Sequence, residues 1–219
     1  MEGNSVTPES ELSQRDTYVR AKVDLYLERA AEYFLCGRFR ATLNELDGVW
    51  RLDPANKEAN QLRDHVNARL KTLANPHETA WVEGKGTPPE HRGEVILVVD
   101  QDPRVLTGLV DSLQSYGFHC LGANSYEEAL DGLSLCRPSV VLSEVNFQDG
   151  PRGFDLFRHL RSNDTGSYPL FIFLVANISK EVESAGQKLG VENFIRKPFD
   201  NDVVVTAVLQ ALSRHRQAS

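Results

Sequence analysis

Three charged side chains in the second half of the sequence, Asp100, Glu144 and Lys197, each follow the end of a short apolar run. When such runs are parallel strands of one sheet, their carboxyl ends meet at the same edge of that sheet. We therefore expect two carboxylates and an ammonium group to lie close together. Paired carboxylates can hold a divalent cation, and an ammonium group can neutralise a negative charge. The crevice at this edge is where we expect the functional site.

The elements that would position these residues alternate regularly along residues 94–214. Asp102 and Ser125 are suited to begin helices as N-caps, and Gly117 is suited to end one. Apolar spacing predicts strands at 95–99, 119–123, 140–143, 170–175 and 193–196, and helices at 103–117, 125–133, 154–161, 180–189 and 203–214. Five strands that alternate with five helices predict an α/β fold, a (βα)5 doubly wound parallel sheet.

The first part of the chain has helical spacing instead. Three helices are expected, with apolar faces made of Val23, Leu27, Ala30, Ala31 and Phe34, of Phe39, Leu43, Leu46 and Val49, and of Leu62, Val66, Leu70 and Leu73. Proline and glycine gather in residues 74–93, which we interpret as a linker. We therefore expect a disordered or frayed N-terminus at 1–15, a smaller all-α domain at 16–73, this linker, and the α/β domain at 94–219.

Composition excludes several classes of protein. The chain has 219 residues, of which 41% are hydrophobic and 25% charged, as in ordinary soluble proteins. Its net charge of -7 repels nucleic acid and anionic lipid, and the segment after residue 93 carries -5 of it (11 Lys and Arg against 16 Asp and Glu). The three cysteines fit neither a disulfide framework nor a zinc site. Without a signal peptide or an apolar run near the ~20 residues of a membrane span, the chain is expected to be cytoplasmic.

The motifs VILVVDQDP, VVLSEV and FIRKPF occur in this order within residues 94–214 and resemble the receiver domain of bacterial response regulators. The resemblance implies a receiver/flavodoxin-like fold and a histidine kinase as a partner. In that family, an aspartate that ends the third strand accepts a phosphoryl group with the help of Mg²⁺ on an acidic pair. A lysine before a proline neutralises the new charge, and a Thr or Ser after the fourth strand reports it together with an aromatic residue.

Several of these positions carry a different residue in this chain. Asp100 matches the first acid of the pair, but Gln101 stands at the second and its neutral amide is a poorer Mg²⁺ ligand. Glu144 occupies the phosphoacceptor position and is one methylene longer than aspartate, which places it differently for in-line attack. Val175 offers no hydroxyl at the Thr or Ser position, whereas Lys197 is retained. These departures predict a degenerate pseudo-receiver.

Each of these residues also has a structural interpretation. Glu144 either imitates part of a phosphorylated state beside Lys197 or only satisfies the buried ammonium group. Asp100 either holds a weak divalent cation with Glu144 or accepts hydrogen bonds. Asp149 is either a turn residue or a displaced phosphoacceptor. Phe194, at the aromatic switch position, belongs either to the core or to a partner surface.

The segment AAEYFLCGRFRATLNELDGVWRLDP resembles a tetratricopeptide repeat, a helix-turn-helix unit of about 34 residues. Gly37, Phe39 and Pro54 fit that pattern, whereas Thr42 and Val49 stand where the repeat usually has alanine. A single repeat cannot bury both of its faces. We therefore expect the third helix, the α/β domain or a second copy of the chain to cover it.

These features predict a two-component-type signalling adaptor without enzymatic activity and without a cofactor, in which the pseudo-receiver is a phosphorylation-independent protein-protein interaction module. Its partner would be a protein such as a histidine kinase, and a homodimer is an open alternative. The first rival function is a phosphorylatable single-output response regulator or phosphate sink that uses Glu144 or Asp149. The second is a metal-dependent phosphohydrolase, with Mg²⁺ held by Asp100 and Glu144.

Overall fold

The computed structural model describes residues 8–74, 91, 93–147, 153–162, 168–189, 191 and 193–218. The chain divides into two compact units, one made of Met1–Phe34 and Phe39–Ala68 and the other of Leu35–Arg38 and Arg69–Ser219. Within the described ranges, we find no helix with both the length and the apolar character that crossing a bilayer requires.

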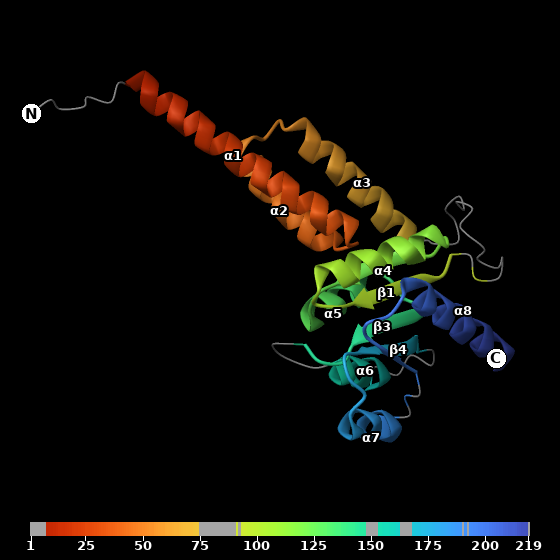
Figure 1. The fold of residues 1–219 in the computed structure, drawn as a ribbon. Coiled ribbons are helices and arrows are strands. Elements are labelled where there is room, and N and C mark those ends of the chain that lie inside the picture. Colours follow the sequence, from red (N-terminus) through yellow and green to blue (C-terminus); the bar gives the residue numbers. More distant parts are fainter. Residues whose placement is uncertain are drawn as a thin grey trace, which may run out of the picture. The chain divides into compact units, whose positions relative to one another are not determined.

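The first unit is helical. Its elements are α1 (Pro8–Leu35), α2 (Phe39–Leu52) and the first part of α3 (Lys57–Ala74) (Figure 1). The core of the unit consists of Val23 and Ala30 from α1, Leu46 and Val49 from α2, and Ala59 from α3. The apolar spacing thus predicted most of the inward faces of α1 and α2, but Ala31 of the predicted α1 face is exposed. The structure adds Ala59 to the face of α3.

Helix boundaries in this unit have local causes. Helix α2 ends at Leu52, just before Pro54, because proline cannot continue the helical hydrogen-bond ladder. The side chain of Asn56 begins α3, since its Oδ1 accepts a hydrogen bond from the backbone N of Ala59 at 2.9 Å. Helices α1 and α2 approach closely at Gly48, where a Cβ atom would meet the ring of Tyr26.

The prediction of a disordered or frayed N-terminus at 1–15 differs in part from the structure. Helix α1 begins at Pro8, so residues 8–15 are helical, while residues 1–7 lie outside the described residues. Proline fits the first turn of a helix because the N–H that it lacks would have no helical partner there. Gln14 and Arg15 are exposed. Leu12 is the only large aliphatic residue in this stretch, so apolar spacing gave no sign of the extension.

The second unit contains a five-stranded parallel sheet with the strand order β2-β1-β3-β4-β5 among the described residues. Its strands are β1 (Val95–Val99), β2 (His119–Ala123), β3 (Val140–Glu144), β4 (Leu170–Val175) and β5 (Phe194–Arg196). Its helices are α4 (Pro103–Ser115), α5 (Tyr126–Leu135), α6 (Gly153–Ser162), α7 (Lys180–Leu189) and α8 (Asn201–Ala218). The predicted (βα)5 doubly wound sheet is confirmed.

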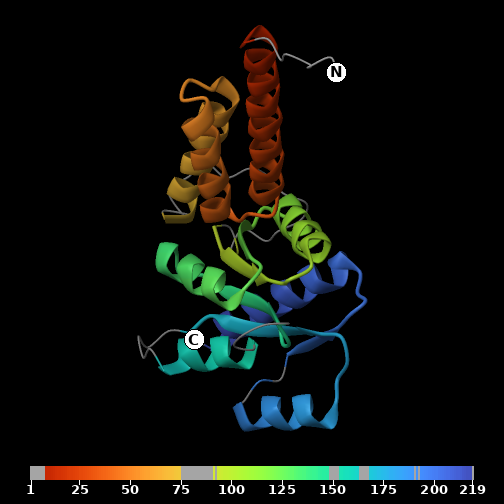
Figure 2. The ribbon, with the colours of Figure 1, turned by 90° about the vertical axis from the view of Figure 1, so that its left-hand side faces the viewer.

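Helices cover both faces of this sheet. Helices α4 and α8 lie on one face and α5 and α6 on the other (Figure 2). On the first face, Leu109 of α4 and Val208 of α8 pack with Ile96 and Leu142 of the strands. On the second face, the rings of Phe154 and Phe173 meet edge to face at 4.8 Å. Strands β1, β3 and β4 are therefore buried on both sides, as expected for apolar runs without alternation, whereas β5 at the edge is only partly buried.

The α/β unit extends beyond the predicted boundary at residue 94. His91 is fully buried, and its Nε2 lies 3.1 Å from the hydroxyl of Ser213 on α8. The remainder of the predicted linker that follows α3 lies outside the described residues, apart from the buried Gly93. The segment Leu35–Arg38 also belongs to this unit, and its Gly37 carbonyl accepts a hydrogen bond from Gly122 N at 3.2 Å. This bond uses a backbone donor of the edge strand β2 that would otherwise be unpaired.

Candidate functional site

The carboxyl-end edge of the sheet brings together the three charged side chains that the sequence singled out. Lys197 Nζ lies 2.6 Å from Asp100 Oδ2 and donates a hydrogen bond to Glu144 Oε1 at 3.0 Å. The side chain of Asp100 is fully buried, while those of Lys197 and Glu144 are 18% and 19% exposed. One ammonium group is thus shared by two carboxylates in a largely buried crevice.

The backbone explains why Asp100 lies there. It follows β1 directly, and its backbone N donates to the carbonyl of Ala123 at the end of β2. Its Oδ1 accepts a hydrogen bond from the backbone N of Asp102 at 3.0 Å. Asp102 in turn is the N-cap of α4, as predicted, and accepts from Arg104 N at 2.9 Å. The first turn of α4 therefore fixes the orientation of the buried carboxylate.

Lys197 and Glu144 are held by the neighbouring strands. The backbone N of Lys197 donates to the carbonyl of Val175 at 2.7 Å, which continues the pairing of β5 with β4. Glu144 is the last residue of β3, and its carbonyl accepts a hydrogen bond from the hydroxyl of Ser143 at 2.9 Å. The start of α6 approaches so closely that a Cβ atom on Gly153 would clash with that carbonyl. Glycine is therefore required at this position.

The pKa values of Asp100 and Lys197 are both raised, for different reasons. Burial raises the pKa of Asp100 above its usual 3.8, and the charge of Glu144 raises it further, while the hydrogen bond and charge of Lys197 act against both. Burial alone would lower the pKa of Lys197, but the hydrogen bonds and charges of Asp100 and Glu144 outweigh it and raise this pKa. The two pKa shifts are consistent with each other. The charged form of Lys197 is stabilised by two carboxylates, whereas Asp100 is more deeply buried than Glu144 and shares the positive charge of Lys197 with it.

The other predicted positions that the structure describes, Gln101, Val175 and Phe194, have no hydroxyl group to offer to this cluster. Val175 is buried, with 3% of its surface exposed, and Ala176 after it is exposed. Gln101 is partly buried beside Asp100. Phe194 is partly buried and stacks on Phe173, with ring centroids 5.6 Å apart. Asp149, considered above as a displaced phosphoacceptor, lies outside the described residues.

Phe194 therefore packs inward, at least in part. Its ring occupies space on α7 that a Cβ atom on Gly186 would fill. Glycine at this point allows the helix to lie close to the ring. The interpretation of Phe194 as a core residue describes its contacts in this structure, while its place in a partner surface stays a prediction.

Sequence reasoning missed a second polar cluster, at the opposite, amino-end edge of the sheet. It contains Glu94, Arg137, Ser139 and Arg216 around a cavity. Their positions in the sequence could have indicated this cluster. Glu94 and Ser139 come directly before β1 and β3, and the residues that precede parallel strands meet at one edge of the sheet, just as the residues that follow them meet at the other. Their scattered charges had the appearance of ordinary surface residues.

Comparisons with known proteins place the second unit in a family. A family model described as the response regulator receiver domain matches residues 96–209. Transcriptional regulatory protein GlrR of Escherichia coli is 30% identical over 129 residues, which cover 59% of this chain and 28% of GlrR. Probable transcriptional regulator ycf29 of Cyanophora paradoxa is 26% identical over 121 residues, which cover 55% of this chain and 57% of that protein. The chain thus spans only part of the length of these relatives.

Solved structures agree on the fold. The chemotaxis response regulator CheY4 of Vibrio cholerae aligns with a TM-score of 0.50 at 22% identity, covering 54% of this chain and 98% of CheY4. A CheY-like receiver domain protein from Methanospirillum hungatei aligns with a TM-score of 0.53 at 19% identity, covering 57% of this chain and 98% of that one. At such identities the similarity shows the fold alone. Because the family model covers slightly more than half of the sequence and all five strands of the sheet, this chain belongs to the family of response regulator receiver domains.

Proposed function

We propose that the second unit is a pseudo-receiver that works in two-component-type signalling as a phosphorylation-independent protein-protein interaction module, coupled to the helical first unit as an adaptor. The observation that supports this most directly is the position of the Lys197 ammonium group, 2.6 Å from Asp100 and 3.0 Å from Glu144. The cation that would neutralise an incoming phosphoryl group is already paired with two carboxylates. The module would hold one charge state instead of switching between two.

The donor set fits Mg²⁺ poorly, so the proposed mechanism uses no metal ion. Mg²⁺ requires near-octahedral oxygen coordination, and proteins usually hold it with one or two carboxylates while it keeps several water molecules. Here Asp100 Oδ1 accepts from Asp102 N and Asp100 Oδ2 contacts Lys197 Nζ. The next position along the chain offers the neutral amide of Gln101. We accordingly propose that the domain needs no cofactor and has no catalytic activity.

A phosphorylatable regulator is the second candidate, and two features favour it. A carboxylate still ends β3 and an ammonium group still lies within hydrogen-bond distance of it. Against it, Glu144 extends one methylene further than aspartate would, and the buried side chain of Val175 has no hydroxyl with which to bind a phosphoryl oxygen. We therefore rank phosphoryl transfer below partner binding.

We propose a protein, not a nucleic acid, as the partner. One relative is named a DNA-binding transcriptional regulator, NtrC of Klebsiella pneumoniae, but the match covers only 26% of it. The net charge of -7 lies mostly in the receiver half of this chain and disfavours direct contact with phosphate backbones. A histidine kinase or another signalling protein would be the expected partner, and the tetratricopeptide-like helices would offer a second binding surface.

The test compares the natural chain with a variant that restores the three altered positions, Gln101→Asp, Glu144→Asp and Val175→Thr. Both are incubated with acetyl phosphate and Mg²⁺, and the intact mass is measured over time. We expect no phosphorylation of the natural chain, whereas the restored variant should gain a phosphoryl group that is removed by hydroxylamine, the reagent for acyl phosphates. Glu144→Asp alone serves as the matched control for the change in side-chain length.

The possible results separate the candidates. Stable phosphorylation of the natural chain would establish the phosphorylatable regulator and overturn the pseudo-receiver. Continuous release of phosphate from acetyl phosphate would establish a phosphohydrolase. If the natural chain does neither, affinity purification from its host should recover the same protein partner with the natural chain and with a Lys197→Arg variant, which keeps the positive charge.

A further inference from the structure

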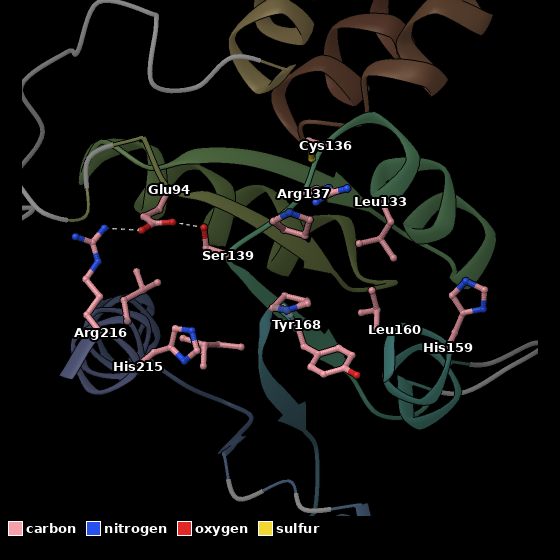
Figure 3. A pocket seen from close by; sticks show the side chains of 14 residues that line it. Glu94, Leu133, Cys136, Arg137, Ser139, His159, Leu160, Tyr168, His215 and Arg216 are labelled. Atoms are coloured by element: carbon pink, nitrogen blue, oxygen red, sulfur yellow. Dashed lines mark hydrogen bonds and ion pairs between the residues drawn. The ribbon is translucent and has the colours of Figure 1, made fainter. Parts of the chain in front are cut away.

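The amino-end edge of the sheet contains a cavity of about 450 Å³, on the opposite side of the domain from the Lys197 cluster. Its walls come from residues that precede β1, β3 and β4 and from α5, α6 and α8. Figure 3 shows Glu94, His215 and Arg216 on one side of it, His159 on the other, and Tyr168 between them. This size lies within the roughly 300–1,000 Å³ of pockets that bind small molecules.

Charges in the wall favour an anion. The carboxylate of Glu94 accepts from Arg216 Nη2 at 2.9 Å through one oxygen and from the hydroxyl of Ser139 through the other (Figure 3). Its negative charge is therefore already compensated. The guanidinium group of Arg137 is exposed at the cavity and forms no ion pair with any described residue. The balance at this edge is positive, although the domain as a whole is acidic.

The remaining wall is apolar and partly aromatic. Leu133, Leu160 and Leu170 are each partly buried and line the cavity together with Tyr168. The guanidinium group of Arg161 lies 4.9 Å from the centroid of the Tyr168 ring and supports it as a cation-π contact. A flat aromatic wall held in this way favours a planar ligand, because aromatic rings stack in offset or edge-to-face arrangements.

We propose that this cavity binds a small organic anion that has a planar apolar body, with the anionic group at Arg137 and the body against Tyr168 and the leucines. An aromatic carboxylate is the simplest member of this class. Both halves of the pattern are needed, since a few well-placed polar groups fix the orientation of a ligand while apolar walls bury it. The site is independent of the Lys197 cluster and does not require phosphorylation.

The probe for this proposal is 1-naphthoate, titrated into the full chain while backbone amide signals are followed by NMR. Saturable shifts are expected at residues around the cavity, including Leu133, Leu160 and Tyr168. The uncharged analogue 1-naphthamide should bind more weakly. Arg137→Glu should weaken 1-naphthoate by about tenfold or more, because it replaces an attractive charge with a repulsive one.

Two further variants keep the result specific. Arg214→Glu makes the same change in net charge at an exposed position of α8 that does not line the cavity, and it should alter affinity by less than about twofold. Arg137→Lys keeps the charge and should retain most of the binding. No saturable shift with millimolar 1-naphthoate, equal binding of 1-naphthamide, or equal losses in Arg137→Glu and Arg214→Glu would each overturn the proposal.

Discussion

The two edges of one sheet use charge in opposite ways. At the carboxyl-end edge, Lys197 is paired with Asp100 and Glu144, and no more than 19% of any of these side chains is exposed. At the amino-end edge, the Glu94 carboxylate is compensated by Arg216 and Ser139, while Arg137 stays exposed beside a cavity of about 450 Å³. We call the first edge closed, because its charged groups are paired with one another, and the second edge open, because Arg137 is exposed beside a cavity.

This difference shows that the edge where ligands usually bind in such a fold need not be the edge that carries an exposed charge beside a cavity. Parallel α/β sheets bind ligands at the carboxyl ends of their strands. In this chain the ammonium group of Lys197 at that edge is already paired with the carboxylates of Asp100 and Glu144. The open cationic group lies instead where the strands begin.

Lys197→Met is the strongest way to break the comparison. It leaves the fully buried Asp100 carboxylate beside Glu144 without a counter-charge, and removing one partner of a buried pair typically costs about 3–5 kcal/mol. We expect a loss of about 3 kcal/mol in the free energy of unfolding, measured with urea. Lys188→Met on α7 is the control, since Lys188 is exposed. A loss below about 1 kcal/mol would show that the interaction of Lys197 with Asp100 and Glu144 does not stabilise the folded protein appreciably.

Asp100→Asn tests the direction of the pKa shift. Because the pKa of Asp100 is raised in the folded protein above its usual 3.8, the folded state keeps a proton at pH values where the unfolded chain has lost it. The stability of the natural chain relative to the variant should therefore fall as pH rises from about 3.8 through the folded pKa. Urea unfolding of both proteins across this range measures it. A relative stability that rises with pH would mean that Lys197 outweighs burial.

Glu144→Gln should have a smaller effect on stability, under about 1 kcal/mol, since Lys197 keeps Asp100 as a partner. Its clearer consequence concerns Asp100, which loses a like charge that raises its pKa. The pH dependence attributed to Asp100 should become shallower. Glu127→Gln, at an exposed position of α5, should leave that dependence unchanged. If stability depends on pH equally in both variants, the charge of Glu144 does not affect the pKa of Asp100.

Glu94→Gln sharpens the comparison at the open edge and should have the smallest effect on stability. Arg216 is 47% exposed, so the ion pair that is lost contributes less than about 0.5 kcal/mol. The change makes the cavity more positive, and 1-naphthoate should therefore bind about twofold more tightly. The same NMR titration measures this affinity. Weaker binding would indicate that Glu94 acts mainly by holding Arg216 in place.

Much of the closed edge could be predicted because strand ends are visible in sequence. Apolar runs placed Asp100, Glu144 and Lys197 at carboxyl ends, and parallel pairing brings such ends together. The N-cap at Ser125 was also visible, and its hydroxyl accepts from Glu128 N at 3.1 Å. The Glu128 carboxylate accepts a hydrogen bond from Asn124 N and forms an ion pair with Arg38, which is distant in sequence. This second contact could not be predicted from the local motif.

The open edge could not be predicted in the same way. Glu94, Arg137 and Arg216 are far apart in sequence and have no motif in common. Apolar spacing also could not detect residues 8–15 as helical or His91 as buried, since the first contain few apolar residues and the second lies in a segment rich in proline and glycine. Such features depend on neighbours that the sequence does not bring together.

By itself, the sequence determined the (βα)5 sheet, the convergence of three charges at its edge and the absence of a hydroxyl at Val175, because these follow from the period of apolar residues and from residue identity. Only the tertiary structure decided that one ammonium is shared by two carboxylates, that the pKa of Asp100 is raised, and that a cationic cavity opens at the opposite edge. Distances between side chains and their removal from water depend on how separate segments pack, and electrostatic energies change steeply with both.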